Sequence, residues 1–85
     1  MKNVQIFTTN YCPYCVRAKD LLKKKNIEFQ EIDLTLDDEG RIALVEKSGG
    51  RKTVPQIFIG DFHVGGCDDL YALDQAGKLD ELLKD

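Results

Sequence analysis

No stretch of the 85-residue sequence comes near the ~20 consecutive apolar residues that a membrane-spanning helix needs. The N-terminal segment MKNVQIFTT also lacks the apolar core of a secretory signal, which predicts a cytoplasmic protein without a membrane association. Basic residues are not in excess, since 12 Lys and Arg stand against 15 Asp and Glu and the net charge is −3. Because a weakly acidic chain offers no surface that follows a phosphate backbone, nucleic acids are not expected as partners.

The remaining composition is that of a soluble globular chain. Apolar residues make up 42% of the sequence and charged residues 32%, which excludes the polar composition of a disordered segment. A chain of this length has room for one domain, and it buries roughly 60% of its unfolded surface on folding. We therefore expect residues 1–85 to form a single domain with a modest core.

Apolar periodicity and turn residues predict alternating strands and helices. The expected elements, in chain order, are a strand over 3–8, a helix over 13–25, a strand over 26–34, a helix that starts near Thr35 and Asp38 and stops at Gly49 and Gly50, a hairpin over 54–66 with Gly60 and Asp61 as its loop, and one or two helices over 67–75 and 79–83.

This order of elements predicts an α/β fold. A strand–helix–strand opening implies a parallel pair with a right-handed crossover, and the hairpin adds two antiparallel strands. The result is a four-stranded mixed sheet flanked by helices on both faces. A Cys-x-x-Cys motif beside such a unit is typical of a thioredoxin-like redox site.

Cysteine is scarce, but Cys12 and Cys15 lie three positions apart in the segment TTNYCPYCVRAKDLL. In a reducing compartment such a pair is more typical of redox or metal chemistry than of a structural disulfide. With Pro13 at the first helical position, Cys12 caps the helix, where free N–H groups and the helix dipole favour its thiolate. Cys15 falls on the apolar face of the helix, so we predict that Cys12 attacks a disulfide and Cys15 resolves the product.

Three segments in this order resemble glutaredoxins, in particular the short bacterial type: CPYC at 12–15, TVP at 53–55 and GGCDD at 65–69. The resemblance covers essentially the whole chain. Thioredoxins usually carry Gly-Pro between the cysteines and a tryptophan before them, whereas this chain has no tryptophan. The chain departs from many glutaredoxins at Thr9, where they have a lysine three residues before the first cysteine.

The resemblance implies a glutathione site. It implies a cis peptide at Val54-Pro55, with the Val54 backbone pairing with the cysteinyl part of glutathione. It also implies that the start of the last helix holds the γ-glutamyl group and that a basic residue of the second helix meets the glycyl carboxylate. The glutathione-binding residues carried over in this way are Tyr14, Arg41, Thr53, Val54, Pro55, Gly66, Cys67 and Asp68.

The sequence thus predicts a glutathione-dependent thiol–disulfide oxidoreductase, monomeric, with no bound cofactor or metal and with glutathione as co-substrate. Its expected partners are disulfide-containing or glutathionylated proteins, of which ribonucleotide reductase is typical for the family. One alternative is a redoxin reduced by thioredoxin reductase. Another, of a different class, is a metal or iron–sulfur module that uses Cys12, Cys15, His63 and Cys67 as ligands.

Overall fold

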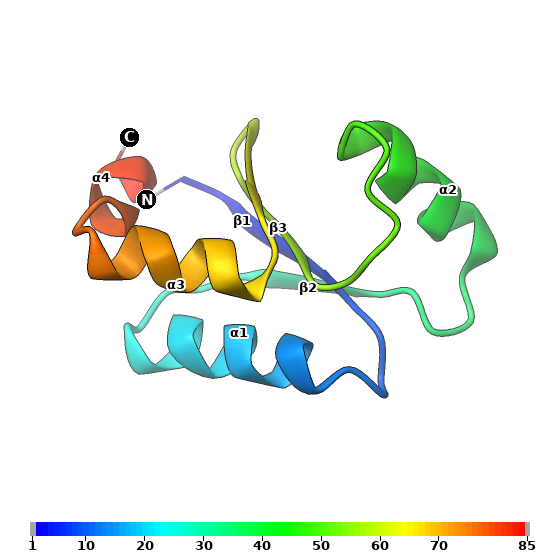
Figure 1. Cartoon of the computed structure of the whole chain (residues 1–85), viewed down its shortest axis with the longest axis horizontal. Helices are drawn as coiled ribbons and strands as arrows, with labels where there is room; N and C mark the ends of the chain where they lie inside the picture. The colour runs from blue at the N-terminus through cyan, green and yellow to red at the C-terminus, as the bar shows by residue number, and fades with distance from the viewer. Residues whose placement is uncertain (1, 85) are drawn as a thin grey trace.

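The computed structural model describes residues 2–84 and shows strands and helices in the predicted order (Figure 1). In chain order the elements are β1 (Val4–Thr8), α1 (Pro13–Lys24), β2 (Gln30–Asp33), α2 (Asp38–Lys47), β3 (Gln56–Ile59), β4 (Phe62–Gly65), α3 (Cys67–Gln75) and α4 (Leu79–Leu83).

The four strands form one mixed sheet in the order β2-β1-β3-β4. β1 and β2 are parallel, while β1 pairs with β3, and β3 with β4, in antiparallel fashion. The hairpin between β3 and β4 has the predicted two-residue loop at Gly60 and Asp61, and Gly60 adopts a φ of 57°. The predicted four-stranded mixed sheet is therefore confirmed.

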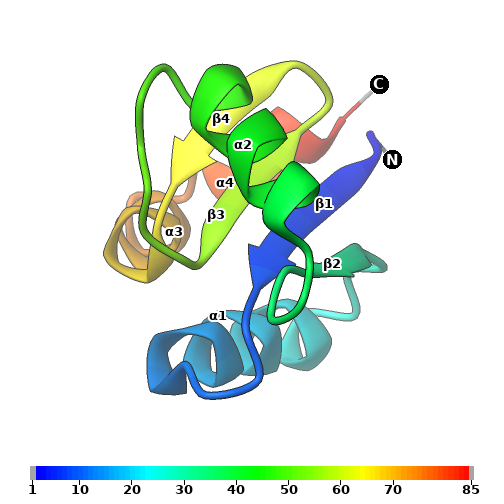
Figure 2. The same ribbon diagram turned by 90° about the vertical axis from the view of Figure 1, so that its right-hand side faces the viewer.

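Helices cover both faces of the sheet, as predicted (Figures 1 and 2). Because side chains alternate along a strand, Ile6 of β1 points into one core with Leu22 of α1 and Leu70 of α3. On the opposite face, Phe7 packs in a second core with Leu44 of α2. The chain leaves the sheet at the end of β1 and continues into α1, and Cys12 lies at the start of that helix (Figure 1).

The structure corrects two predicted element starts. The strand expected from residue 26 begins at Gln30, because Asn26 ends α1 in a left-handed turn with a φ of 58° and sends Ile27 into the core. The cap of α2 is Asp37 and not Thr35, since the Asp37 carboxylate accepts the N–H of Gly40 at 2.9 Å.

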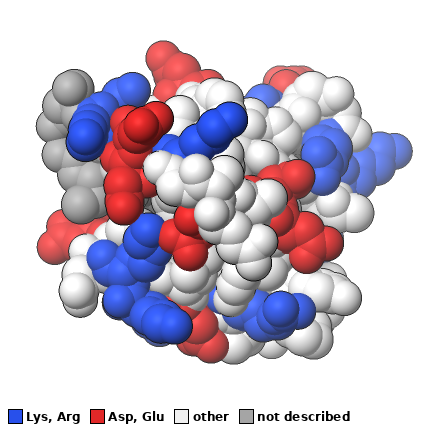
Figure 3. Space-filling view, turned by 60° about the vertical axis from the view of Figure 1, so that its left-hand side comes forward, with Lys and Arg blue, Asp and Glu red and all other residues white. Residues whose placement is uncertain are grey.

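The surface carries charges of both signs. On the face shown in Figure 3, Lys and Arg side chains are interspersed with Asp and Glu side chains around an uncharged area. Within residues 2–84, none of the helices has the length and apolar character needed to cross a bilayer.

Candidate active site

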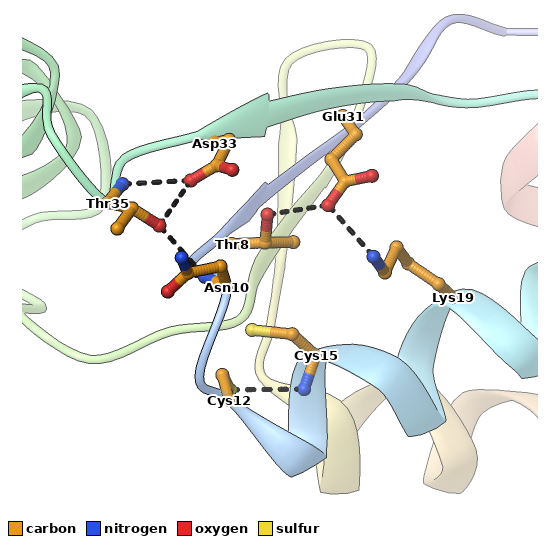
Figure 4. A network of polar contacts seen from close by, with 8 residues as sticks. All are labelled: Thr8, Asn10, Cys12, Cys15, Lys19, Glu31, Asp33 and Thr35. Atoms are coloured by element: carbon orange, nitrogen blue, oxygen red, sulfur yellow. Dashed lines mark hydrogen bonds and ion pairs between the residues drawn. The ribbon is translucent and has the colours of Figure 1, made fainter.

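Cys12 occupies the N-cap of α1, directly before Pro13. Its backbone is extended, with φ −109° and ψ 105°, and its sulfur accepts the N–H of Cys15 at 3.1 Å (Figure 4). Proline at the first helical position leaves no unpaired N–H there. The Cys12 sulfur therefore lies at the positive end of α1, in direct contact with a backbone N–H donor.

The two cysteines of the motif differ in exposure. Cys12 is partly exposed, whereas Cys15 is 1% exposed and faces the sheet. Burial, reinforced by the hydrogen bond with Cys12, raises the pKa of the Cys15 thiol to about 12. Cys15 therefore carries its proton at neutral pH while Cys12 is accessible to a disulfide.

The loop before β3 lies beside the Cys12 sulfur. The thiol of Cys12 donates to the carbonyl oxygen of Val54 at 3.6 Å, and the Val54-Pro55 peptide is cis. A hollow of about 190 Å³ opens here between this loop, α1 and the start of α3. Its lining residues are Tyr14, Arg51, Thr53, Val54, Pro55, Gly66, Cys67, Asp68 and Asp69.

The start of α3 forms one wall of this hollow. Gly66 is the N-cap, and its own N–H donates to the Asp69 carboxylate at 2.9 Å. The N–H groups of Cys67 and Asp68, at the first two helical positions, have no carbonyl partner within a helix. They form an anion-binding end that carries the Asp68 carboxylate at its edge.

Two hydrogen-bond networks fix the segment that carries the motif (Figure 4). In the first, Glu31 of β2 accepts from Thr8 at 2.8 Å and pairs with Lys19 of α1 at 2.9 Å, and this ion pair lowers the pKa of Glu31. In the second, the Asn10 N–H donates to the Thr35 hydroxyl at 2.8 Å, and that hydroxyl donates to Asp33. The first network ties β1 and α1 to β2, and the second ties the loop before Cys12 to Asp33 at the end of β2.

The family model named Glutaredoxin matches residues 4–64 of this sequence. The chain belongs to the glutaredoxin family. It is 58% identical over 83 residues to a glutaredoxin of Pseudomonas aeruginosa, with 98% of each chain covered. Among solved structures, a glutaredoxin from Brucella melitensis shows 60% identity and a TM-score of 0.86, over 99% of this chain and 90% of that one. The buckwheat glutaredoxin–glutathione complex shows 35% identity and a TM-score of 0.86, over 96% and 76%.

These matches confirm the predicted thioredoxin-like fold and the predicted class of enzyme. Glutaredoxins are thiol–disulfide oxidoreductases, and this chain is therefore one. The Cys12 and Cys15 pair, close together at the start of α1, is consistent with the redox-active motif of such an enzyme.

The hollow is lined by every glutathione-binding residue that the sequence suggested except Arg41. Arg41 lines a neighbouring groove of about 240 Å³ that shares Val54 with the hollow. There its guanidinium donates to the carbonyl of Leu34 at 3.0 Å and to the hydroxyl of Tyr11 at 3.3 Å.

Two charged residues that line the hollow were not predicted from the sequence. The sequence predicts no role for Arg51, and Asp69 enters only as the last residue of the segment GGCDD. The available signal for Asp69 was its place three residues after Gly66, which is the spacing of a capping box. For Arg51 the only signal was its nearness in sequence to Thr53, and a loop residue so placed has no fixed direction.

Thr9, where this glutaredoxin departs from many relatives, is 6% exposed. Its hydroxyl oxygen is buried without a hydrogen-bond partner among the described residues. A lysine at this position would have to carry its ammonium out of a buried site. The position at which the family resemblance implies a lysine therefore holds a small, buried side chain in this chain.

The four side chains of the metal-site alternative are not brought together as one ligand set. His63 lies on β4, stacks on Phe58 with ring centroids 4.7 Å apart, and contacts the Gln56 amide at 2.7 Å. Within residues 2–84, no group of three or more His, Cys, Asp or Glu side chains is placed to hold a metal ion.

The different exposure of the thiols predicts a selective reaction with iodoacetamide. Because burial and the hydrogen bond with Cys12 raise the pKa of Cys15 to about 12, this thiol keeps its proton at neutral pH. Burial also raises the pKa of Cys67. We expect one cysteine, Cys12, to be alkylated rapidly, as followed by intact mass and peptide mapping. Rapid modification of a second cysteine in the folded chain would contradict this assignment.

Proposed function

We propose that this glutaredoxin uses glutathione as co-substrate and reduces both glutathione mixed disulfides and protein disulfides. The observation that carries the proposal is the placement of the Cys12 sulfur 3.6 Å from the Val54 carbonyl, at the edge of the hollow. An extended cysteinyl residue can pair with the Val54 backbone there and bring its sulfur next to Cys12. The buckwheat relative, which was crystallised as a glutathione complex, supports this use of the hollow.

The other groups of glutathione find complementary partners. The γ-glutamyl carboxylate suits the N–H groups of Cys67 and Asp68, and the ammonium beside it suits the Asp68 carboxylate. The glycyl carboxylate requires a cation. Arg51 lies in the lining of the hollow, and Arg41 lies beyond Val54 in the adjoining groove, so this basic side receives the glycyl end. Tyr14, 55% exposed, forms the outer wall.

Cys12 and Cys15 divide the reaction between them. The Cys12 thiolate attacks the glutathione sulfur of a mixed disulfide, expels the partner thiolate and becomes glutathionylated. A second glutathione thiolate then attacks that adduct, releases glutathione disulfide and restores Cys12. With a protein disulfide, the Cys12 thiolate attacks one of the two sulfurs, forms a mixed disulfide with it and releases the other as a thiolate. Cys15 then loses its proton and attacks the Cys12 sulfur, which releases the second protein thiolate and leaves a Cys12–Cys15 disulfide. Two glutathione molecules reduce this disulfide and leave as glutathione disulfide.

The proposal includes the setting in which the chain works. It acts as a single-domain monomer, residues 1–85, in the cytoplasm, where reduced glutathione is the abundant thiol. Its partners are disulfide-containing or glutathionylated proteins. The family resemblance makes ribonucleotide reductase the candidate to assay first.

Recycling of the oxidised chain tests the proposal against the alternative reductant. The oxidised form should be reduced by glutathione with glutathione reductase and NADPH, and much more slowly by thioredoxin reductase with NADPH. The same disulfide substrate and the same enzyme concentration serve both arms. Efficient turnover with thioredoxin reductase alone would favour the alternative redoxin and contradict the glutathione proposal.

We also expect the fold and activity to be independent of metal. The chain has two apolar cores on opposite faces of its sheet, so folding does not need the free energy of metal binding. After chelator treatment the circular dichroism spectrum and the glutathione-dependent turnover should both be retained. Stoichiometric zinc in the purified protein, with collapse of the spectrum on its removal, would instead favour the four-ligand module.

A further inference from the structure

Gln56, the first residue of β3, carries a side-chain amide that is fully buried at 0% exposure. Its Nε2 donates to the carbonyl oxygen of Thr53 at 3.1 Å and lies 3.2 Å from the Thr53 hydroxyl. Its Oε1 lies 2.7 Å from Nε2 of His63, on the neighbouring strand β4. A buried amide is costly without such partners, so these contacts fix both its position and its orientation.

The direction of each hydrogen bond follows from one fixed acceptor. The Thr53 carbonyl can only accept, so the NH₂ group of Gln56 must face Thr53 and its oxygen must face His63. His63 therefore donates from Nε2. Its ring is held in that orientation by stacking on Phe58, with an interplanar angle of 19°. Because Nε2 bears hydrogen in this tautomer and in the protonated imidazole alike, the chain of bonds does not depend on the charge of His63.

Thr53, Gln56 and His63 form a chain of contacts that connects β4 to the wall of the hollow. Thr53 lies in the loop before β3, and the other end of this loop is held by Ser48, whose hydroxyl bonds the N–H and carbonyl of Arg51, each at 3.0 Å. Thr53 itself is exposed, so its conformation depends on what it is tied to. Gln56 supplies that tie immediately beside Val54.

We infer that Gln56 and His63 are positioning residues for the ligand-binding loop 53–55, acting through the Thr53 carbonyl from the side of the sheet that faces away from the ligand. The inference rests on the proposed function, since it assigns the Val54 backbone to glutathione. Neither side chain touches the hollow, whose lining includes neither Gln56 nor His63. Their effect is to hold the Val54 backbone in the geometry that pairs with the cysteinyl residue.

The test compares two rates in each variant: kcat/KM for a glutathionylated peptide, and the rate of Cys12 alkylation by iodoacetamide. Gln56→Leu keeps the volume of the side chain and removes both donors to Thr53. We expect its kcat/KM to fall roughly tenfold, as the loss of one or two neutral hydrogen bonds implies, while the alkylation rate changes less than twofold. His63→Leu should show a smaller fall of the same kind, and His63→Gln, which retains an N–H donor, should restore it.

Ile59→Val is the matched control, because Ile59 is buried in the same strand but points into the opposite core. It should lower thermal stability and leave the ratio of the two rates unchanged. An unchanged ratio in Gln56→Leu, or equal behaviour of His63→Gln and His63→Leu, would overturn the inference while glutathione-dependent turnover of the unmodified chain persists. Absence of that turnover in the unmodified chain would refute the proposed function and this inference with it.

Discussion

Replacement of Cys12 by serine is expected to reduce thiol transfer to the uncatalysed background on every disulfide substrate. Cys12 is the partly exposed thiol at the positive end of α1, whereas Cys15 and Cys67 are 1% and 4% exposed. A serine hydroxyl is not ionised at neutral pH and does not form the mixed disulfide that the reaction needs. Because serine is itself a favourable helix cap, the variant should keep the fold, and its circular dichroism spectrum is the control.

Cys15→Ser should separate the two substrate classes. Turnover of a glutathionylated peptide needs only Cys12 and a second glutathione, so this activity should be retained. Reduction of a protein disulfide needs a resolving thiol, so it should fall strongly. Equal losses in Cys12→Ser and Cys15→Ser on both substrates, measured with glutathione reductase and NADPH, would show that the two thiols do not have these separate roles.

Gly65→Ala should be the most damaging single methyl addition near the site. Gly65 has a φ of +113°, which side-chain-bearing residues rarely adopt, and a Cβ at this position would overlap the Asp69 carboxylate. Strain of this kind costs about 1–3 kcal/mol, and loss of the Asp69 bond to Gly66 adds about 0.5–2 kcal/mol. For a domain of this size we expect Tm to fall by at least about 6 °C.

The same substitution should weaken glutathione use, because the displaced Asp69 sets the start of α3 on the wall of the hollow. Gly77→Ala is the matched control. Gly77 also has a positive φ, +72°, but no atom lies within 4 Å of the added Cβ. We expect this control to lose only about 1 kcal/mol and to keep its KM for the mixed disulfide. If both variants lost the same stability and showed the same rise in KM, the Asp69 contact would be unimportant.

The parts of the fold that could be predicted from sequence carry their signals locally. Pro13 after Cys12 marks a helix start, and the Gly60-Asp61 pair marks a hairpin loop. The start of β2 could not be predicted in this way. An apolar residue such as Ile27 fits both a buried strand and a buried turn. Only its packing in the core shows that it follows the turn at Asn26 and does not belong to the strand.

The segments that form the site could be predicted for the same reason, because their signals are local. The segments at 12–15, 53–55 and 65–69 are short and specific, and the sheet brings them together beside Cys12. The basic residues could not be placed, because Arg41 lies on α2 and Arg51 in a loop, so their directions depend on packing. The capping role of Asp37 was hidden because Thr35 is engaged by Asp33 instead.

The most direct test of the account is the site of glutathione attachment in the Cys15→Ser variant. After reaction with glutathione disulfide, intact mass and peptide mapping should show one glutathione per chain, attached to Cys12, with backbone amide shifts in nuclear magnetic resonance spectra changing at Thr53, Val54, Cys67 and Asp68. Attachment to Cys67, or attachment to Cys12 without any change in these four amides, would contradict the proposal that Cys12 and the adjoining hollow form the glutathione site.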